Sequence, residues 1–217
     1  MPLAGRPMVE WSIEACRAAG SVRSIVVACP PGHVHELAGH DFGVVEGGAT
    51  RAHSVANALQ AVGTEYVAIH DAARPLVTPE LIEEVVATLV SDPGAAGAIA
   101  ATPVTDTIKR AASTGRRDSK RSISSLSVPS AADIVLETLD REGLWGAQTP
   151  QVFRVEALRE ALAGDPERVA AATDESMLIE AVGGRVLIHP SAAENLKVTT
   201  PLDLELAGLL LSQRSAQ

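Results

Sequence analysis

The sequence has 217 residues and a mass of 22.5 kDa, a size that fits one α/β domain better than two. Its 18 lysines and arginines stand against 27 aspartates and glutamates, and the resulting net charge of -9 repels a nucleic-acid backbone. Two tryptophans, one tyrosine and two phenylalanines leave few rings that could stack on bases. We therefore expect a single domain over residues 1–217 and no nucleic-acid partner.

The cysteines and the hydropathy pattern indicate the cellular compartment in which we expect the protein. Cys16 and Cys29 are too few for a disulfide framework, and neither belongs to a Cys-x-x-Cys pair. No apolar run approaches the length needed to cross a bilayer, and the N-terminus lacks a charged region followed by an apolar stretch. We expect a cytoplasmic protein with no membrane partner.

Short apolar, β-branched segments alternate with segments of helical periodicity, which is typical of β-α-β units in a parallel sheet. Thr50 can cap a helix that Gly63 ends, and Thr78 and Thr200, each followed by proline, open two more. The helix after Thr78 has a wide apolar stripe that fits one face of the sheet. The pattern predicts strands at residues 23–29, 65–70, 97–101, 185–189 and 195–198.

Residues 113–130 interrupt this alternation, because they are rich in serine and basic residues and poor in apolar ones. We expect a long solvated tip there. Residues 105–110 and 134–139 flank it as two extended segments, which can pair as an antiparallel arm over about residues 103–147. Because exposed strand edges favour pairing with another chain, we expect a homodimer formed through this arm.

The strongest local motif is V-A-I-H-D-A-A-R-P at residues 67–75, which reads as a buried strand followed by polar and small residues. In an open parallel sheet, ligands bind at the carboxyl ends of the strands. There Asp71 could orient a hydroxyl group or a hydrated Mg²⁺, Arg74 offers a guanidinium suited to phosphate, and Ala72 leaves room for a substrate beside the backbone. The alternative is an ordinary strand-to-helix turn.

Two further segments are candidates for anion binding. Gly48 and the glycine before it precede the helix expected after Thr50, where free backbone N–H groups could receive an anion or a base edge. An ordinary capped turn explains the same residues. Lys197 is a lone cation in a short apolar segment, where a lysine is unusual unless an anion binds nearby. The standard P-loop and G-x-G-x-x-G motifs are absent, which disfavours P-loop and dinucleotide-binding enzymes.

Other features are expected to be structural. The three histidines within residues 33–40 lie in a polar, glycine-containing loop, so we expect surface side chains and no metal site. Residues 173–175, Thr-Asp-Glu, fit a helix start with carboxylates favoured by the helix dipole, and a role near Mg²⁺ is the alternative. Trp11 and Trp145 are expected to anchor the core.

Together these motifs resemble the 2-C-methyl-D-erythritol 4-phosphate cytidylyltransferase family, from Pro2 to about Leu211. The resemblance implies a Rossmann-like α/β fold, with helices on both faces of a mostly parallel sheet and a projecting antiparallel arm. It also implies cytidylyl transfer from CTP to methylerythritol phosphate in non-mevalonate isoprenoid synthesis, with Mg²⁺ largely bound to the phosphates. The segments that carry it are residues 3–7, 47–54, 70–75, 103–110, 140–150, 173–175 and 195–201.

The resemblance also implies site residues, each at a position that matches a family motif. Two of the arm residues, Thr107 and Arg141, would reach the active site of the partner subunit. Ala49 stands where the family often has an acidic residue. The implied set is Lys197 and Arg141 for catalysis, Asp71, Ala72, Arg74, Thr107 and Thr149 for the acceptor, and Gly48, Ala49 and Ser54 for the nucleotide.

The sequence departs from the family in two places. Family members begin with a strand and a glycine-rich loop, P-A-A-G-x-G-x-R followed by P-K, whereas this sequence begins where the family pattern continues after that lysine. We expect either a true start about 25 to 35 residues upstream or an inactive chain, and we favour the former because the other site residues remain. The tip at residues 113–130 is also longer than the usual arm turn.

Three other functions stay open from the sequence. A cytidylyltransferase for ribitol or another pentitol phosphate would share the fold and the reaction. A non-catalytic nucleotide-binding or dimerisation module would share only the fold. A dinucleotide oxidoreductase is disfavoured by the missing glycine fingerprint.

Overall fold

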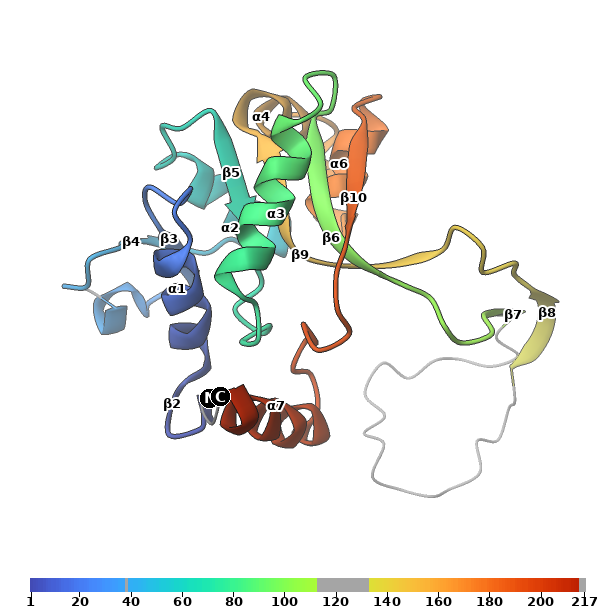
Figure 1. Ribbon diagram of the computed structural model, residues 1–217. Coiled ribbons are helices and arrows are strands. Elements are labelled where there is room, and N and C mark those ends of the chain that lie inside the picture. Colours follow the sequence, from blue (N-terminus) through green and yellow to red (C-terminus); the bar gives the residue numbers. More distant parts are fainter. Residues whose placement is uncertain (38, 113–132, 215–217) are drawn as a thin grey trace. The chain divides into compact units, whose positions relative to one another are not determined.

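The computed structural model describes residues 1–37, 39–112 and 133–214. The tip expected at residues 113–130 lies outside these described residues. The chain divides into two compact units, a larger one of residues 1–102 and 147–217 and an arm unit of residues 103–146. Figure 1 shows the helices and strands of each unit.

The elements follow the α/β alternation that the sequence predicts. The helices are α1 (Met8–Ala18), α2 (Arg51–Leu59), α3 (Pro79–Val90), α4 (Val155–Leu162), α5 (Pro166–Ala171), α6 (Glu175–Ala181), α7 (Pro201–Arg214) and the short 3₁₀ helix η1 (Val34–Leu37). The strands are β1 (Pro2–Leu3), β2 (Arg6–Pro7), β3 (Val26–Cys29), β4 (Gly43–Glu46), β5 (Tyr66–Ile69), β6 (Gly97–Pro103), β7 (Lys109–Ala112), β8 (Ile134–Thr138), β9 (Trp145–Arg154) and β10 (Val186–Pro190).

The strands of the larger unit form separate sheets. One has the order β10-β6-β9-β5, in which β10 and β6 are parallel and β9 runs antiparallel to β5. A second sheet pairs β3 with β4 in parallel, and β1 and β2 form a small antiparallel hairpin. Four of the five predicted strands, at β3, β5, β6 and β10, are confirmed with ends that differ by up to three residues.

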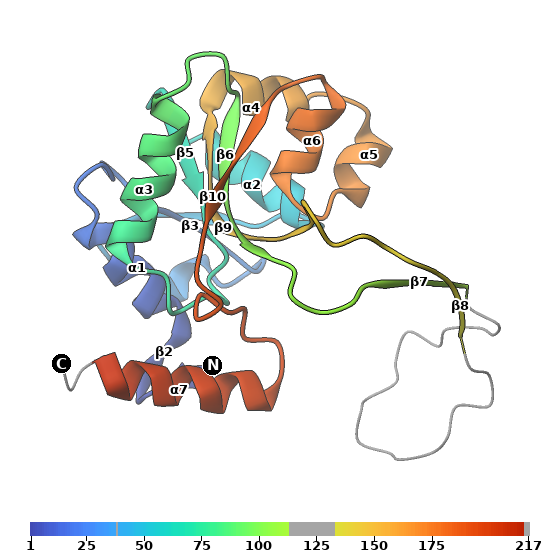
Figure 2. The same ribbon diagram turned by 45° about the vertical axis from the view of Figure 1, so that its right-hand side comes forward.

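Helices cover both faces of the four-stranded sheet, as expected (Figure 2). Side chains alternate along β6, so Ala98 and Ala100 cluster with Leu89 of α3 on one face. Ile99 lies in the opposite cluster with Leu158 of α4. The core therefore consists of two apolar layers with the sheet between them, and small alanines let α3 approach the strand closely.

The predicted helix starts are confirmed by their caps. Thr50 accepts a hydrogen bond from the backbone N–H of His53, and Thr78 accepts one from Leu81. Asp174 caps α6 in the same way, by accepting from the N–H of Met177. Each cap satisfies a backbone donor that a helix end leaves without a partner.

The strand predicted at residues 195–198 is wrong, because this segment is a loop. Its buried Asn195 donates through Nδ2 to Gln148 Oε1 and to the Thr149 carbonyl, both at 2.9 Å. The N–H of Val198 donates to the Ala73 carbonyl at 2.7 Å. The segment is therefore held by side-chain and single backbone bonds instead of a strand ladder.

The arm unit contains the predicted antiparallel pair, with Lys109 opposite Thr138. The first strand begins at Lys109 and not at residue 105, and the pairing shifts register between Arg110 and Ala111. Trp145 is 36% exposed, so its predicted role as a core anchor is wrong. Every residue of β7 and β8 is exposed, and an arm without an interior cannot enclose an indole.

Trp11 does pack against an apolar cluster, and its indole Nε1 donates to the Leu3 carbonyl at 3.1 Å. The three histidines within residues 33–40 are exposed, as expected. Within the described parts of the chain, no helix combines the length and the apolar character that crossing a membrane requires.

Candidate active site

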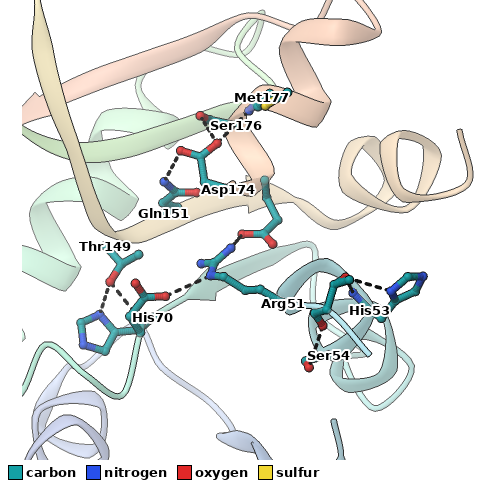
Figure 3. Close-up of polar contacts among 12 residues, drawn as sticks. Arg51, His53, Ser54, His70, Thr149, Gln151, Asp174, Ser176 and Met177 are labelled. Carbon is teal, nitrogen blue, oxygen red and sulfur yellow. Dashed lines mark hydrogen bonds and ion pairs between the residues drawn. The ribbon is translucent and has the colours of Figure 1, made fainter. Parts of the chain in front are cut away.

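The candidate site is centred on Asp71, which follows β5 at the carboxyl end of the strand. Asp71 Oδ1 accepts a hydrogen bond from Arg51 Nε at 3.1 Å, and Oδ2 pairs with Lys197 Nζ at 2.9 Å. The backbone N–H of Asp71 donates to Thr149 Oγ1 at 3.1 Å. The fold thus brings Asp71, Thr149 and Lys197 together, although they are far apart in the sequence. Figure 3 shows Thr149 of this cluster beside His70, and Arg51 on the neighbouring helix α2.

Arg51 joins this cluster to a buried carboxylate. Its Nη1 donates to Glu175 Oε2, and the side chain of Glu175 is only 1% exposed. Burial tends to raise the pKa of Asp71, but the hydrogen bond from Lys197 and the charge of Arg51 lower it below its ordinary value. Burial is the larger effect at Glu175 and raises the pKa of that group, although Arg51 opposes it. Arg51 therefore bridges two carboxylates with two different nitrogens.

Arg74 fixes the loop that carries Lys197. Its Nη1 donates to the Asn195 carbonyl at 2.8 Å, and its Nη2 donates to the Ala147 carbonyl at 3.4 Å. Burial lowers the pKa of Arg74, and its buried Nε has no hydrogen-bond partner within the described structure. Because these partners are neutral carbonyls, its positive charge stays available to an anion.

His70 orients the hydroxyl group of Thr149, which contacts the backbone of Asp71. Its Nε2 lies 3.1 Å from the Arg74 carbonyl, and its Nδ1 lies 3.0 Å from Thr149 Oγ1. Burial lowers the pKa of His70 to about 4, so the ring is neutral at pH 7. Since a carbonyl can only accept, Nε2 carries the proton, and Nδ1 accepts from the Thr149 hydroxyl. That hydroxyl is then oriented to accept from the N–H of Asp71.

Two of the expected nucleotide residues, Gly48 and Ala49, lie in the turn between β4 and α2, and the third, Ser54, lies in the first turns of α2. The N–H of Gly48 donates to Ser54 Oγ at 3.0 Å, and Ser54 Oγ donates to the Thr50 carbonyl at 3.0 Å. A Cβ at Gly48 would lie 2.3 Å from His53 Cβ, so only glycine fits this close turn. Ala49 is exposed at its tip. The helix that follows carries Arg51, which connects the turn to Asp71.

Of the remaining predicted site residues, one lies next to Asp71 and two lie in the arm unit. Ala72 is exposed next to Asp71, where its small side chain leaves the backbone accessible. Thr107 and Arg141 belong to the arm unit, where Arg141 Nη1 donates to the Thr105 carbonyl. Their expected contact with a partner's active site stays a prediction.

Sequence reasoning did not single out Arg51, His70, Glu175 or Asn195 as site residues. Arg51 and Glu175 lie in segments that carry the family resemblance, but 124 residues separate them, and only the fold shows that they pair. The signal that could have found them is that each charge directly follows the residue that caps its helix, Thr50 for α2 and Asp174 for α6. His70 could have been found as the polar residue that ends an apolar strand.

The residues around Asp71 do not fit a Mg²⁺ centre of their own. The described residues contain no group of three or more His, Cys, Asp or Glu side chains placed to hold a metal ion. Arg51 and Lys197 engage both oxygens of Asp71, and Arg51 engages one oxygen of Glu175. These carboxylates are already paired with cations, so the charge that would attract a metal ion is largely neutralised.

The larger unit has an open α/β sheet, and cations lie at the ends of its strands. This combination is typical of α/β enzymes that bind anionic, phosphate-bearing ligands, and it defines the class of the protein. A family model described as "2-C-methyl-D-erythritol 4-phosphate cytidylyltransferase" (IspD) matches residues 1–213. The chain belongs to this family. The resemblance stated from the sequence is thereby confirmed.

Individual relatives agree with the family match. The 2-C-methyl-D-erythritol 4-phosphate cytidylyltransferase of Synechococcus sp. (strain WH7803) is 38% identical over 218 residues, which cover 97% of this chain and 88% of the relative. The protein of that name from Frankia casuarinae is 39% identical over 216 residues, covering 97% and 73%. The crystal structure of the Thermus thermophilus protein matches with a TM-score of 0.76 at 31% identity, covering 97% of this chain and 92% of that one. The expected Rossmann-like fold is confirmed.

Proposed function

We infer that this chain is a cytidylyltransferase that transfers the cytidylyl group of CTP to 2-C-methyl-D-erythritol 4-phosphate. A phosphate oxygen of the acceptor attacks the α-phosphorus of CTP, the bond to the β-phosphate breaks, and pyrophosphate leaves. The product is CDP-methylerythritol, an intermediate of isoprenoid precursor synthesis. The observation that carries this inference is the cluster of Asp71, Arg51 and Lys197 at the carboxyl end of β5 in a chain of this family.

We propose that Lys197 binds the acceptor phosphate. Its side chain is 44% exposed, and its ammonium group has three N–H donors, of which Asp71 needs one. Arg74 adds a second positive charge from the same end of the sheet, and Thr149 holds the backbone of Asp71. Catalysis of this kind rests on positioning and on neutralising charge at the phosphoryl oxygens, so it needs no protein nucleophile.

We propose that cytosine binds beside Gly48, Ala49 and Ser54, where the exposed Ala49 lies next to the hydrogen bond from the Gly48 N–H to Ser54 Oγ. We also propose that Thr107 and Arg141 of the arm contact the acceptor site of a partner subunit, where Arg141 acts as a catalytic cation. The active form of the protein is then a homodimer. Residues 1–217 act as one nucleotidyltransferase domain in the cytoplasm. Mg²⁺ supplies charge neutralisation when it is bound to the triphosphate, and no protein ligand for it is assigned.

Acceptor choice gives the direct test of this function. Pyrophosphate release is followed with CTP and either methylerythritol phosphate or ribitol 5-phosphate, and calorimetry measures acceptor binding separately. We expect binding and release with methylerythritol phosphate and at least about tenfold less of both with ribitol 5-phosphate. Equal or stronger binding of ribitol 5-phosphate would assign the chain to a pentitol phosphate instead.

A further inference from the structure

Lys197 lies in the segment of residues 195–200, which is a loop and not a strand. Before Lys197, the buried side chain of Asn195 anchors this loop to β9. Just after Lys197, the N–H of Val198 donates to the Ala73 carbonyl at 2.7 Å. The position of the Lys197 side chain therefore depends on how firmly the following residues, at the start of α7, are held.

Asp203, in the first turn of α7, binds the residues that follow this loop position. Its Oδ2 accepts hydrogen bonds from the N–H of Thr199 at 2.9 Å, from the hydroxyl of Thr199 at 2.9 Å and from the N–H of Thr200 at 2.8 Å. The N–H of Asp203 in turn donates to Thr200 Oγ1 at 3.2 Å. The bonds from Thr199 and Thr200 lower the pKa of Asp203 to about 2, so its carboxylate is charged at pH 7.

Two of these contacts go beyond what a helix cap requires. The reciprocal bonds between Asp203 and Thr200 form a capping box, which satisfies backbone donors at the start of the helix. The two bonds from Thr199 instead reach one residue further back, into the loop. Because Thr199 is only two residues after Lys197, Asp203 restrains the loop as well as the helix.

Helix α7 is also held by contacts that do not involve Asp203. Its buried Ala207 and Leu211 pack in one apolar cluster with Leu76. At the other end of the helix, Arg214 donates through Nη1 to the Leu76 carbonyl at 2.9 Å. Since this packing and this bond keep α7 in place, loss of the Asp203 side chain should loosen the loop more than it displaces the helix.

We propose that Asp203 is a positioning residue of the acceptor site, which holds the backbone at Thr199 so that Lys197 Nζ stays beside Asp71. Asp203 acts through this backbone and does not contact the acceptor. Ordering a loose loop upon binding costs free energy, so a loop that is already ordered binds the phosphate more tightly. The inference rests on the proposed function in one respect, which is the role of Lys197 in binding the acceptor phosphate.

Calorimetric titration with methylerythritol phosphate compares the wild type with Asp203→Ala, Lys197→Ala and the double variant. We expect Asp203→Ala to raise the Kd of the acceptor at least about threefold, and by less than Lys197→Ala does. In the double variant, Asp203→Ala should add less than about twofold, because no Lys197 side chain remains to be positioned. A merely structural role would lower the affinity by the same factor in both backgrounds.

Three further variants separate positioning from helix stability. Asp203→Asn keeps a side-chain oxygen that accepts the same bonds, so its acceptor Kd should stay within about twofold of the wild type. Thr199→Val removes the hydroxyl bond but leaves the capping box, so it should raise the Kd less than Asp203→Ala does. Asp165 caps α5 by accepting from the N–H of Glu167, so Asp165→Ala should lower the Tm at wild-type acceptor affinity.

Hydrogen exchange at the Val198 N–H needs no substrate. We expect exchange at least about tenfold faster in Asp203→Ala and unchanged in Asp165→Ala. If Asp203→Ala does not fold, Thr199→Val takes its place in the titrations and in the exchange measurement. Unchanged exchange at Val198, or an equal loss of affinity with and without Lys197, would overturn the positioning role. Wild-type acceptor affinity in Lys197→Ala would contradict the proposed function instead, while exchange at Val198 would still decide whether Asp203 holds the loop.

Discussion

Arg51 is the residue on which the geometry of the site depends most. Its Nε contacts Asp71, and its Nη1 contacts the buried Glu175, so one guanidinium holds two elements of the fold against α2. The planar fork of arginine suits this task, because a lysine has a single charged nitrogen and cannot reach both carboxylates in the same way.

Replacing Arg51 with alanine should leave Glu175 buried without its partner. We expect Arg51→Ala to lower the free energy of unfolding by about 3–5 kcal/mol, measured by urea denaturation at about pH 7.5. Arg159→Ala is the control, since Arg159 pairs with an exposed Glu156, and its loss should cost at most about 1 kcal/mol. The double variant Arg51→Ala, Glu175→Gln should recover part of the loss. Equal costs for Arg51→Ala and Arg159→Ala would contradict the bridging role.

Because His70 is buried with a lowered pKa, we expect the stability of the chain to depend on pH. Its folded pKa of about 4 lies below the ordinary value of 6.5, so the unfolded chain binds the proton more readily. The contribution is complete above pH 6.5 and is lost as the pH falls toward 4, and the difference corresponds to about 3 kcal/mol. Urea denaturation from about pH 7.5 to about pH 5 should show this slope in the wild type and a smaller slope in His70→Asn. Identical slopes would show that His70 is not buried as a neutral ring.

At the scale of single elements, the turn before α2 is fixed by close packing. We expect Gly48→Ala to destabilise the chain by about 1–3 kcal/mol and to weaken CTP binding, because the added Cβ would overlap His53. Gly63→Ala is the matched control, since an added Cβ there meets nothing within 4 Å. Calorimetric titration with CTP and thermal unfolding measure both effects. Unaltered CTP affinity in Gly48→Ala would remove the turn from the nucleotide site.

The elements also show how far the sequence predicts the structure. Apolar runs and threonine caps are local signals, so β3, β5, β6 and β10 and the starts of α2 and α3 could be predicted. Strand β9 was missed because it buries Gln148, Thr149 and Gln151, which break the apolar pattern. The loop at residues 195–198 was mistaken for a strand because its apolar residues pack without a ladder. Lys197 was found, but its partner Asp71 follows from the fold alone.

For the whole molecule, local charge at the site opposes the net charge. The chain carries -9, yet Arg51, Arg74 and Lys197 gather around Asp71 at the candidate site. Two anionic substrates therefore meet cations concentrated in one place on an acidic protein, which favours their binding there. Before any substrate binds, Asp71 holds Lys197, and the Asn195 carbonyl holds Arg74.

The central claim is that Lys197, oriented by Asp71, binds the phosphate of the acceptor. Calorimetric titration of methylerythritol phosphate into the wild type, Lys197→Ala and Arg185→Ala tests it most directly, because Arg185 is an exposed cation paired with Asp92. A charged hydrogen bond of about 1.5–3 kcal/mol predicts a Kd roughly 10- to 100-fold higher for Lys197→Ala. Arg185→Ala should bind the acceptor with wild-type affinity. Wild-type acceptor affinity in Lys197→Ala would contradict the claim.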